Sequence, residues 1–255
     1  MCIRDSIDTG LPNAFTTEFP SDLKVYLLGG EKVTTHQPLY ATDLLPGLPF
    51  TYPPFAGVVF SWLTESTALG VAWKALSVLV VLLVARASTS KHALLLTAVF
   101  VLCLSPVQGT LFFGQVNLLL MGLVCLDFLP RYRLPGIGVG LAAGLKLTPA
   151  FFILLLIQQR RWGAVFIAAF TFLCTVATGF SEVTDAKTFW TDAIFRTTRI
   201  GADDNPGAQS IRQVLARAGH DELWLWLALS ALVTALGLFA CLLYTSPSPR
   251  DKRQS

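Results

Sequence analysis

Charged residues are scarce in this chain. Asp, Glu, Lys and Arg make up only 14% of its 255 residues, whereas hydrophobic residues make up 53%, and the mean hydropathy is +0.60. Soluble domains carry roughly 25% charged residues, so this chain has too little polar surface for one. The composition therefore excludes an ordinary soluble fold and predicts a protein that lies in a lipid bilayer.

The sequence also lacks the patterns of several chemistries. Its cysteines show neither disulfide nor metal-ligand spacing, and His36 and His220 have no ligand-type residue at a suitable distance along the chain. Phosphate-binding glycine loops and a Ser-His-Asp arrangement are missing too. The basic residues form no stripe with interleaved aromatics. We therefore expect no metal, no other cofactor and no nucleic-acid partner.

Both ends of the chain differ in character from the sequence beside them. Residues 1–6 and residues 241–255 resemble translated adapter sequence that recurs at the ends of metagenomic reading frames. Such segments are set apart from reasoning about the fold. We therefore expect one integral-membrane domain over residues 7–240, and a natural protein that is longer at both ends.

Long apolar runs recur along the rest of the chain. A helix needs about 20 residues to cross the roughly 30 Å of hydrocarbon in a bilayer. The candidate spans are Leu69–Ala85, His92–Leu104, Leu111–Leu129, Gly136–Ile157, Trp162–Phe180 and Leu223–Leu243. They predict an all-α, multi-pass transmembrane helical bundle.

The short loops carry the basic residues, which concentrate on the cytoplasmic side of membrane proteins. If Gly136–Ile157 crossed the membrane once, the basic loop before it and the basic loop after it would lie on opposite faces of the membrane. Lys146-Leu147-Thr148-Pro149 interrupts that run, so the sequence favours two half-helices that enter and return over a straight span with Arg160 outside. The cytoplasmic loops would then hold Arg86 with Lys91, Arg131 with Arg133, and Arg160 with Arg161.

Two polar loops then fall on the outer face and should converge there, namely residues 21–55 and residues 181–222. In the first loop, Ser21 as an N-cap and Gly29-Gly30 as a stop predict a two-turn helix, Asp22–Leu28. Asp22 and Tyr26 would share one face of that helix. The adjacent prolines of Leu48–Phe55 predict an extended, aromatic-rich elbow.

Asp22 is the leading candidate for a catalytic base. A transfer to a hydroxyl group needs a carboxylate near the membrane surface to accept the proton. Asp43 lies in the same loop and is the alternative. Because an Asp that caps a short helix is ordinary, the position alone does not separate a catalytic role from a structural one.

Other polar residues suit an anionic or sugar-bearing substrate. Lys146 lies in an apolar run, where an ammonium group usually faces a cavity or a partner; the alternative is a lysine that only stabilises the break. Gln115 and Asn117 suit sugar hydroxyls or contacts between helices, and a helix would point them about 200° apart. Arg212 and Arg217 suit a phosphate group or a solvated helix surface.

Seven segments of the chain matter more as an ordered set than singly: Asp22-Leu23-Lys24-Val25-Tyr26, Gly29-Gly30, Pro38-Leu39-Tyr40, Leu48–Pro54, Gly114-Gln115-Val116-Asn117, Gly140–Pro149, and Gln209-Ser210 with Arg212. Together they resemble glycosyltransferase family 87, which belongs to the GT-C superfamily of polyprenyl-phosphate-sugar-dependent transferases. The resemblance covers roughly residues 21–240. One departure is Ala208-Gln209-Ser210, where the family would have Asn-Gln-Ser.

The resemblance implies a multi-pass enzyme of the cell membrane whose active site faces the extracytoplasmic side. It would move a sugar, with mannose favoured, from a polyprenyl-phosphate carrier to a glycolipid or glycan by an inverting displacement. Asp22 would be the general base. The donor site would include Lys146, Arg212, Gln115 and Asn117. Four aromatic side chains would stack on the sugar or on the first isoprene units, namely Tyr26, Tyr40, Phe50 and Tyr52. The alternative is that these four form an interfacial belt.

Two alternatives stay open at this point. An arabinofuranosyltransferase of the same family would use the same carrier phosphate. A secondary transporter would also use a broken helix with an intramembrane lysine, but it would predict a matching break elsewhere, and none is visible in the sequence.

Overall fold

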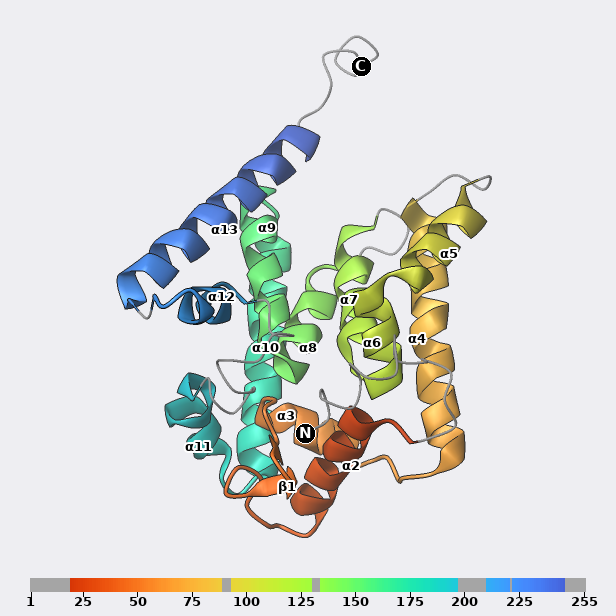
Figure 1. The fold of residues 1–255 in the computed structure, drawn as a ribbon, viewed down its shortest axis with the longest axis vertical. Coiled ribbons are helices and arrows are strands. Elements are labelled where there is room, and N and C mark those ends of the chain that lie inside the picture. Colours follow the sequence, from red (N-terminus) through yellow and green to blue (C-terminus); the bar gives the residue numbers. More distant parts are fainter. Residues whose placement is uncertain (1–18, 89–92, 130–133, 197–209, 221, 246–255) are drawn as a thin grey trace.

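A computed structural model describes residues 19–88, 93–129, 134–196, 210–220 and 222–245 of the chain (Figure 1). The expected leader, most of the expected tail, Lys91, Arg131, Arg133 and Gln209 lie outside these residues. The elements in chain order are α2 (Ser21–Thr34), β1 (Asp43–Leu45), β2 (Leu48–Pro49), α3 (Pro54–Phe60), α4 (Thr67–Ser88), α5 (Leu94–Cys103), α6 (Ser105–Phe113), α7 (Asn117–Phe128), α8 (Ile137–Leu145), η2 (Thr148–Phe151), α9 (Phe152–Gln158), α10 (Trp162–Glu182), α11 (Ala186–Thr191), η3 (Ala193–Phe195), α12 (Ile211–Arg217) and α13 (Leu223–Thr245).

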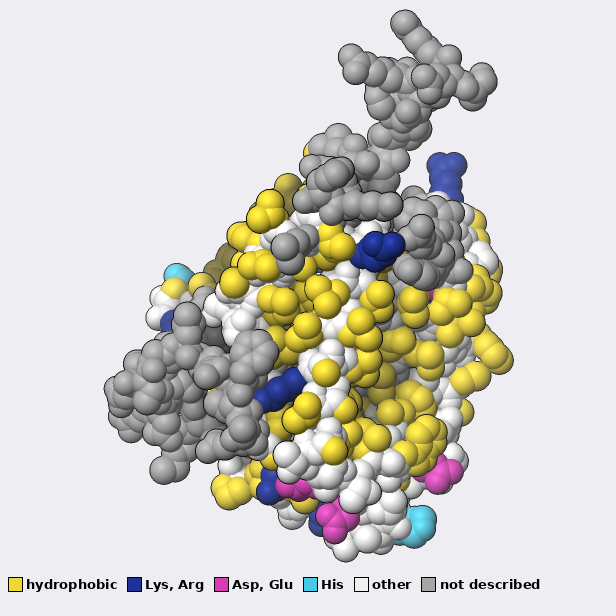
Figure 2. All heavy atoms as spheres, turned by 90° about the vertical axis from the view of Figure 1, so that its right-hand side faces the viewer, with side chains coloured by type: hydrophobic (Ala, Val, Ile, Leu, Met, Phe, Trp, Pro, Cys, Tyr) yellow, Lys and Arg dark blue, Asp and Glu magenta, His cyan; other side chains and the backbone are white. Residues whose placement is uncertain are grey.

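The helices form a membrane-type bundle. Within the described residues, α4, α10 and residues Leu223–Cys241 of α13 are long and apolar enough to cross a bilayer, and α5 with α6 makes a bent pair that passes the same test. Figure 2 shows hydrophobic side chains over the middle of one face and acidic side chains near its lower end. These features confirm the predicted all-α, multi-pass bundle.

The connection predicted between the second and third spans is wrong. The two spans leave residues 105–110 between them as a loop, but Leu104 only makes an extended step (φ −66°, ψ 132°) and α6 follows at once. Pro106 fits the first turn of a helix, where its missing N–H is harmless. The 68° bend between α5 and α6 therefore lies where a loop was expected, and α7 starts a separate short helix.

The predicted stop of the first helix at Gly29-Gly30 is also wrong, because α2 continues to Thr34. A Cβ added to Gly29 would lie 2.5 Å from a ring carbon of Phe50. A Cβ added to Gly30 would lie 2.5 Å from the backbone of Phe60. The glycines thus permit close packing against the elbow and α3, which outweighs their low helix propensity. The residue that precedes the helix is Pro20 rather than Ser21.

The proline elbow is extended as predicted up to Pro53 (φ −55°, ψ 154°), but α3 begins already at Pro54. A proline is tolerated at the first position of a helix because its nitrogen has no intrahelical partner there. Before the elbow, β1 and β2 form a small antiparallel pair in which Asp43 faces Pro49.

The run from Gly136 to Ile157 breaks at Lys146, which is extended (φ −153°, ψ 130°). Along α8, added Cβ atoms at Gly136, Gly140 and Gly144 would meet Ala164, Thr171 and Thr175 in turn, so α8 and α10 run in the same direction. Since α9 leads into α10 through a short turn, it runs back against α8. The predicted break at Lys146 is confirmed, and the entry and return of the two half-helices from one side of the membrane stays a prediction.

The two polar loops meet, as predicted. Both carboxylate oxygens of Asp185, just before α11, accept hydrogen bonds of 2.8 Å from the backbone N–H groups of Leu39 and Tyr40. Residues about 145 positions apart in the chain are thereby tied together at the end of the bundle that carries α2. This end holds the candidate site.

Candidate functional site

The turn between α6 and α7 lies directly on the start of α2. Gly114 has a left-handed backbone (φ 69°), and an added Cβ there would lie 2.5 Å from Pro20 Cβ. The indole N–H of Trp73 donates to the Gly114 carbonyl oxygen at 2.9 Å. Only glycine fits this turn without strain, and the turn places Gln115 beside Asp22.

Four side chains from three parts of the chain form a continuous polar cluster. Gln115 Nε2 donates to Asp22 Oδ2 at 2.9 Å. Asn117 Nδ2 donates to Gln115 Oε1 at 2.8 Å, and Lys146 Nζ donates to Asn117 Oδ1 at 3.0 Å. The structure thus brings together the predicted base, both predicted amides and the predicted intramembrane lysine.

The prediction that Gln115 and Asn117 point apart is wrong. It assumed one regular helix, but α7 begins only at Asn117, and Gln115 lies in the preceding turn. Because the turn has its own backbone direction, the two amides contact each other. The 3.6-residue period applies only inside a helix.

Two tyrosines border this cluster. The hydroxyl groups of Tyr26 and Tyr52 share a hydrogen bond of 2.7 Å, and Lys146 Nζ lies 5.3 Å from the centre of the Tyr52 ring. A cation at this distance is attracted by the negative face of the ring. The elbow therefore contributes one aromatic surface to the site, beside the lysine.

Burial dominates the electrostatics of the groups on α2 and on the elbow. It raises the pKa of the Asp22 carboxyl, although hydrogen bonds from Gln115 and Ser21 and the charge of Lys146 act in the opposite direction. Burial also raises the pKa of Tyr26 well above its usual range and that of Tyr52 to about 12. Both phenols therefore stay neutral near pH 7 and act through hydrogen bonds rather than as bases.

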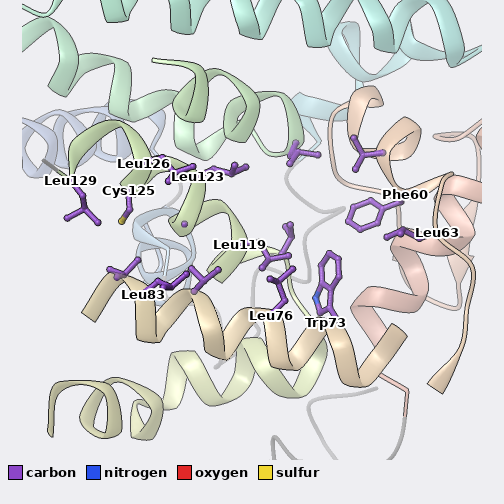
Figure 3. A pocket seen from close by; sticks show the side chains of 16 residues that line it. Phe60, Leu63, Trp73, Leu76, Leu83, Leu119, Leu123, Cys125, Leu126 and Leu129 are labelled. Atoms are coloured by element: carbon purple, nitrogen blue, oxygen red, sulfur yellow. The ribbon is translucent and has the colours of Figure 1, made fainter. Parts of the chain in front are cut away.

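An apolar groove of about 510 Å³ runs between α4 and α7 (Figure 3). Leu83, Leu126 and Leu129 line it at one end, and Phe60 and Trp73 line it at the other. The lining also includes Val116 and Leu145, the immediate neighbours of Asn117 and Lys146 in the chain.

The aromatic wall between groove and cluster is continuous. The Phe60 ring lies 4.7 Å from the Tyr26 ring, centre to centre, on one side, and 5.8 Å from the Trp73 ring on the other. Phe60 thus contacts both the groove and Tyr26 at the edge of the cluster. This size and lining are typical of small-molecule sites, which are mostly apolar with a few convergent polar groups.

Other predicted residues lie elsewhere. Asp43 is exposed on β1. Arg212 is exposed on α12, and no hydrogen bond or ion pair joins it to the cluster within the part of the chain that is described. Tyr40 and Phe50 are buried in the core, at 3% and 0% exposure, so they do not form an interfacial belt.

Sequence reasoning missed residues that position the site. Asp127, fully buried on α7, accepts hydrogen bonds from Gly136 N at 2.9 Å and Val139 N at 2.7 Å at the start of α8. Its place in an apolar run was a signal, because buried carboxylates there usually have a partner. Asp185 gave no such signal, since it is one of several acidic residues in a polar loop.

Among the described residues, no three His, Cys, Asp or Glu side chains lie close enough together to bind a metal ion. The acidic groups of the cluster are limited to Asp22, which has amide and lysine neighbours. The chemistry that this site offers is proton transfer by a carboxylate together with charge neutralisation by an ammonium group.

The fold and the site together define a polytopic helical membrane protein with a polar cluster at one end of an apolar groove. The sequence pattern of glycosyltransferase family 87 matches residues 50–254, most of the chain. The chain belongs to this family. The matched range includes Tyr52, Gln115, Asn117 and Lys146, whereas Asp22 precedes it.

Similar curated proteins come from mycobacteria. The chain is 34% identical, over 88% of its length, to a polyprenol-phosphate-mannose-dependent alpha-(1-2)-phosphatidylinositol mannoside mannosyltransferase of Mycobacterium tuberculosis, and covers 60% of that protein. The protein of the same description in Mycolicibacterium smegmatis is 33% identical over 86% of the chain, which covers 58% of it.

A third relative has a related description. The polyprenol-phosphate-mannose-dependent alpha-(1-2)-phosphatidylinositol pentamannoside mannosyltransferase of M. tuberculosis is 32% identical over 84% of the chain, which covers 54% of it. The chain thus spans little more than half the length of these relatives. No solved structure matches the chain.

Proposed function

We propose that the chain is part of a membrane mannosyltransferase that moves mannose from polyprenyl-phosphate mannose to a hydroxyl group of a glycolipid. The observation that carries the proposal is the placement of Asp22 and Lys146 in one hydrogen-bonded cluster at the end of an apolar groove. Family membership and the descriptions of the mycobacterial relatives support the same donor.

In the proposed step, the acceptor hydroxyl oxygen attacks C1 of the mannosyl group while the bond from C1 to the phosphate oxygen breaks. Asp22 takes the hydroxyl proton. A single displacement of this kind inverts the configuration at C1. The raised pKa of Asp22 brings the carboxylate closer to the working pH, where a general base is most effective.

Lys146 serves the other end of the reaction. The leaving polyprenyl phosphate gains negative charge as the bond to C1 breaks, and an ammonium group placed beside it stabilises that charge. Lys146 lies at the end of α8, where the break in the helix frees its side chain to face the cluster. We give Arg212 no part in this step, because its side chain is exposed on α12.

The groove between α4 and α7 would hold the first isoprene units of the donor. Its lining is almost entirely apolar, and it ends beside Phe60, Val116 and Leu145, next to the cluster. Burial of apolar surface gives about 25 cal/mol per Å². Tail contacts would therefore supply donor affinity without touching the reacting atoms.

The charge distribution supports a site on the extracytoplasmic face of the cell membrane. Arg86 lies in the last turn of α4, far from Trp73, which contacts the site turn near the start of that helix. Arg161 Nη1 donates to the Asp127 carbonyl oxygen at 2.8 Å, at the end of α7 away from Asn117. Arg86 and Arg161 thus lie away from the cluster, where the rule that basic loops are cytoplasmic expects them.

The test is a transfer assay with three donors on the protein in membranes, expressed with any residues that its native gene adds to this chain. The donors are polyprenyl-phosphate mannose, polyprenyl-phosphate arabinofuranose and the soluble sugar donor GDP-mannose, each labelled in the sugar. Membrane glycolipids serve as acceptors.

Label that enters glycolipid from polyprenyl-phosphate mannose alone is the expected result. Transfer from the arabinofuranosyl donor alone would replace mannose by the alternative sugar. Transfer from GDP-mannose alone, or no transfer by protein that binds none of the donors, would overturn the proposal. Uptake of free sugar into sealed vesicles without any transfer would favour a transporter.

A further inference from the structure

The hydrogen bonds between Lys146 and Asp22 all run in one direction. Lysine is only a donor and an ionised carboxylate only an acceptor, so the two ends of the cluster fix which way each amide faces. Asn117 must turn its oxygen to Lys146 and Gln115 must turn its nitrogen to Asp22, as observed. The N–H of Asn117 that reaches Gln115 then completes an aligned series of dipoles from cation to anion.

We infer that Gln115 and Asn117 are positioning residues that hold Asp22 and Lys146 at a fixed separation and orient both for the reaction, rather than residues that mainly bind sugar. This inference rests on the proposed function, because it assigns the base to Asp22 and the phosphate to Lys146. The bridge formed by the two amides adds to the proposed function a statement of how Asp22 and Lys146 are kept in place.

The reason for such a bridge lies in the charges. A carboxylate and an ammonium group that share a half-buried site attract strongly, and direct pairing would consume the lone pairs and N–H groups that the substrates need. Among the described residues the two groups form no direct ion pair, although the charge of Lys146 acts to lower the pKa of Asp22. The amides separate them by three hydrogen bonds.

The bridge leaves binding capacity at both ends. Gln115 occupies Oδ2 of Asp22, while Oδ1 has only a long contact of 3.5 Å from Ser21. Lys146 gives one of its three N–H bonds to Asn117. An acceptor hydroxyl can therefore reach Oδ1 while the donor phosphate takes the remaining N–H groups of the lysine.

The bridge also affects the proton affinity of the base. The titratable groups around Asp22 are Lys146, Tyr26 and Tyr52, and both phenols stay neutral near pH 7. The hydrogen bond from Gln115 favours the ionised carboxylate and so opposes the effect of burial. Removal of this bond raises the pKa of Asp22 further.

The test compares Gln115→Leu with the wild type through the pH dependence of kcat and the KM for polyprenyl-phosphate mannose. We expect the acid limb of the profile to move up by about one pH unit or more, as the loss of a hydrogen bond to a charged group predicts, with little change in donor KM. A purely structural defect would lower kcat evenly at every pH.

Gln37→Leu is the matched control. Gln37 accepts a hydrogen bond of 2.7 Å from Lys32 on the exposed surface after α2, so the same exchange removes an amide–lysine contact outside the site. We expect this variant to keep both the profile and the donor KM of the wild type.

A second variant, Asn117→Asp, tests the other half of the bridge. Asp at position 117 pairs Lys146 with a full negative charge and cannot donate to Gln115 Oε1. We expect donor KM to rise at least about tenfold, since the lysine is less available to phosphate.

If Gln115→Leu does not fold, infrared titration of the Asp22 carboxyl band in Asn117→Leu, against the wild type and Asp22→Asn, replaces the kinetic profile. An unchanged Asp22 titration in folded bridge variants, with donor KM also unchanged, would overturn the bridge but leave the proposed function standing. Full transfer activity in Asp22→Asn would instead remove the proposed function.

Discussion

Lys146→Met removes the cation of the site while keeping a side chain of similar length. In the structure the ammonium group donates to Asn117 Oδ1 at 3.0 Å and lies 5.3 Å from the Tyr52 ring centre, so methionine fills the space without the charge. The variant therefore isolates the proposed contact with the donor phosphate.

The expected effect has two parts. A hydrogen bond from a charged group contributes about 1.5–3 kcal/mol, which corresponds to a loss of roughly 10- to 150-fold in donor affinity. Loss of a preorganised group that stabilises charge in the transition state lowers kcat by a further factor of about 10²–10³. Together they predict a fall in kcat/KM of at least about 10³.

The assay measures transfer of labelled mannose from polyprenyl-phosphate mannose in membranes, with donor concentration varied so that kcat and KM are separated. Lys24→Met is the matched control, because Lys24 only pairs with Glu65 at 3.7 Å on the surface, and such pairs contribute at most about 1 kcal/mol to stability. Donor kinetics of folded Lys146→Met within about threefold of those of the wild type would refute the assignment of the phosphate to Lys146.

Three further predictions concern stability, each read by thermal unfolding in detergent. Gly138→Ala would place a Cβ 2.0 Å from a backbone oxygen and should destabilise the protein by about 1–3 kcal/mol. A Cβ at Gly163 meets nothing within 4 Å, so Gly163→Ala should stabilise the protein by about 0.5–1 kcal/mol. Equal effects of the two substitutions would contradict the packing of α8. Asp185→Ala leaves two backbone N–H groups without their acceptor and should cost about 2–4 kcal/mol, so a loss below about 1 kcal/mol would contradict the tie between the loops. Asp22→Asn should stabilise the folded protein at neutral pH, because burial raises the pKa of Asp22 and makes its ionised form costly. This gain in stability should shrink as the pH falls through the raised pKa and vanish below the ordinary value of 3.8. A gain that grows toward acid pH would contradict the raised pKa.

The sequence predicted the bundle and the principal site residues, because their signals are local. An apolar run gives its own length, and a lysine or a carboxylate in an apolar setting stands out at once. Lys146 was found in this way, whereas Asp22 lies in a polar loop and was singled out by the proton transfer that the reaction needs and by the family resemblance. The break at Lys146 and the meeting of the two polar loops followed from the basic loops and from the Lys-Leu-Thr-Pro segment.

The errors come from contacts between distant segments. The two glycines of α2 predicted the end of a helix, whereas in the structure Gly29 allows Phe50 to pack against the helix. The amide bridge depends on the left-handed turn at Gly114, whose shape is set by Pro20 and Trp73 on two other elements. No pattern within a short window reports such contacts, because tertiary packing decides them.

The most direct test of the central claim compares donor binding with sugar transfer in Asp22→Asn. Asparagine has nearly the shape of aspartate and can still accept a hydrogen bond from Gln115, but it cannot take a proton from the acceptor. We expect the variant to bind polyprenyl-phosphate mannose as the wild type does, with the rate of transfer reduced by about 10²–10⁴-fold. Transfer at the wild-type rate by this variant would show that Asp22 is not the base.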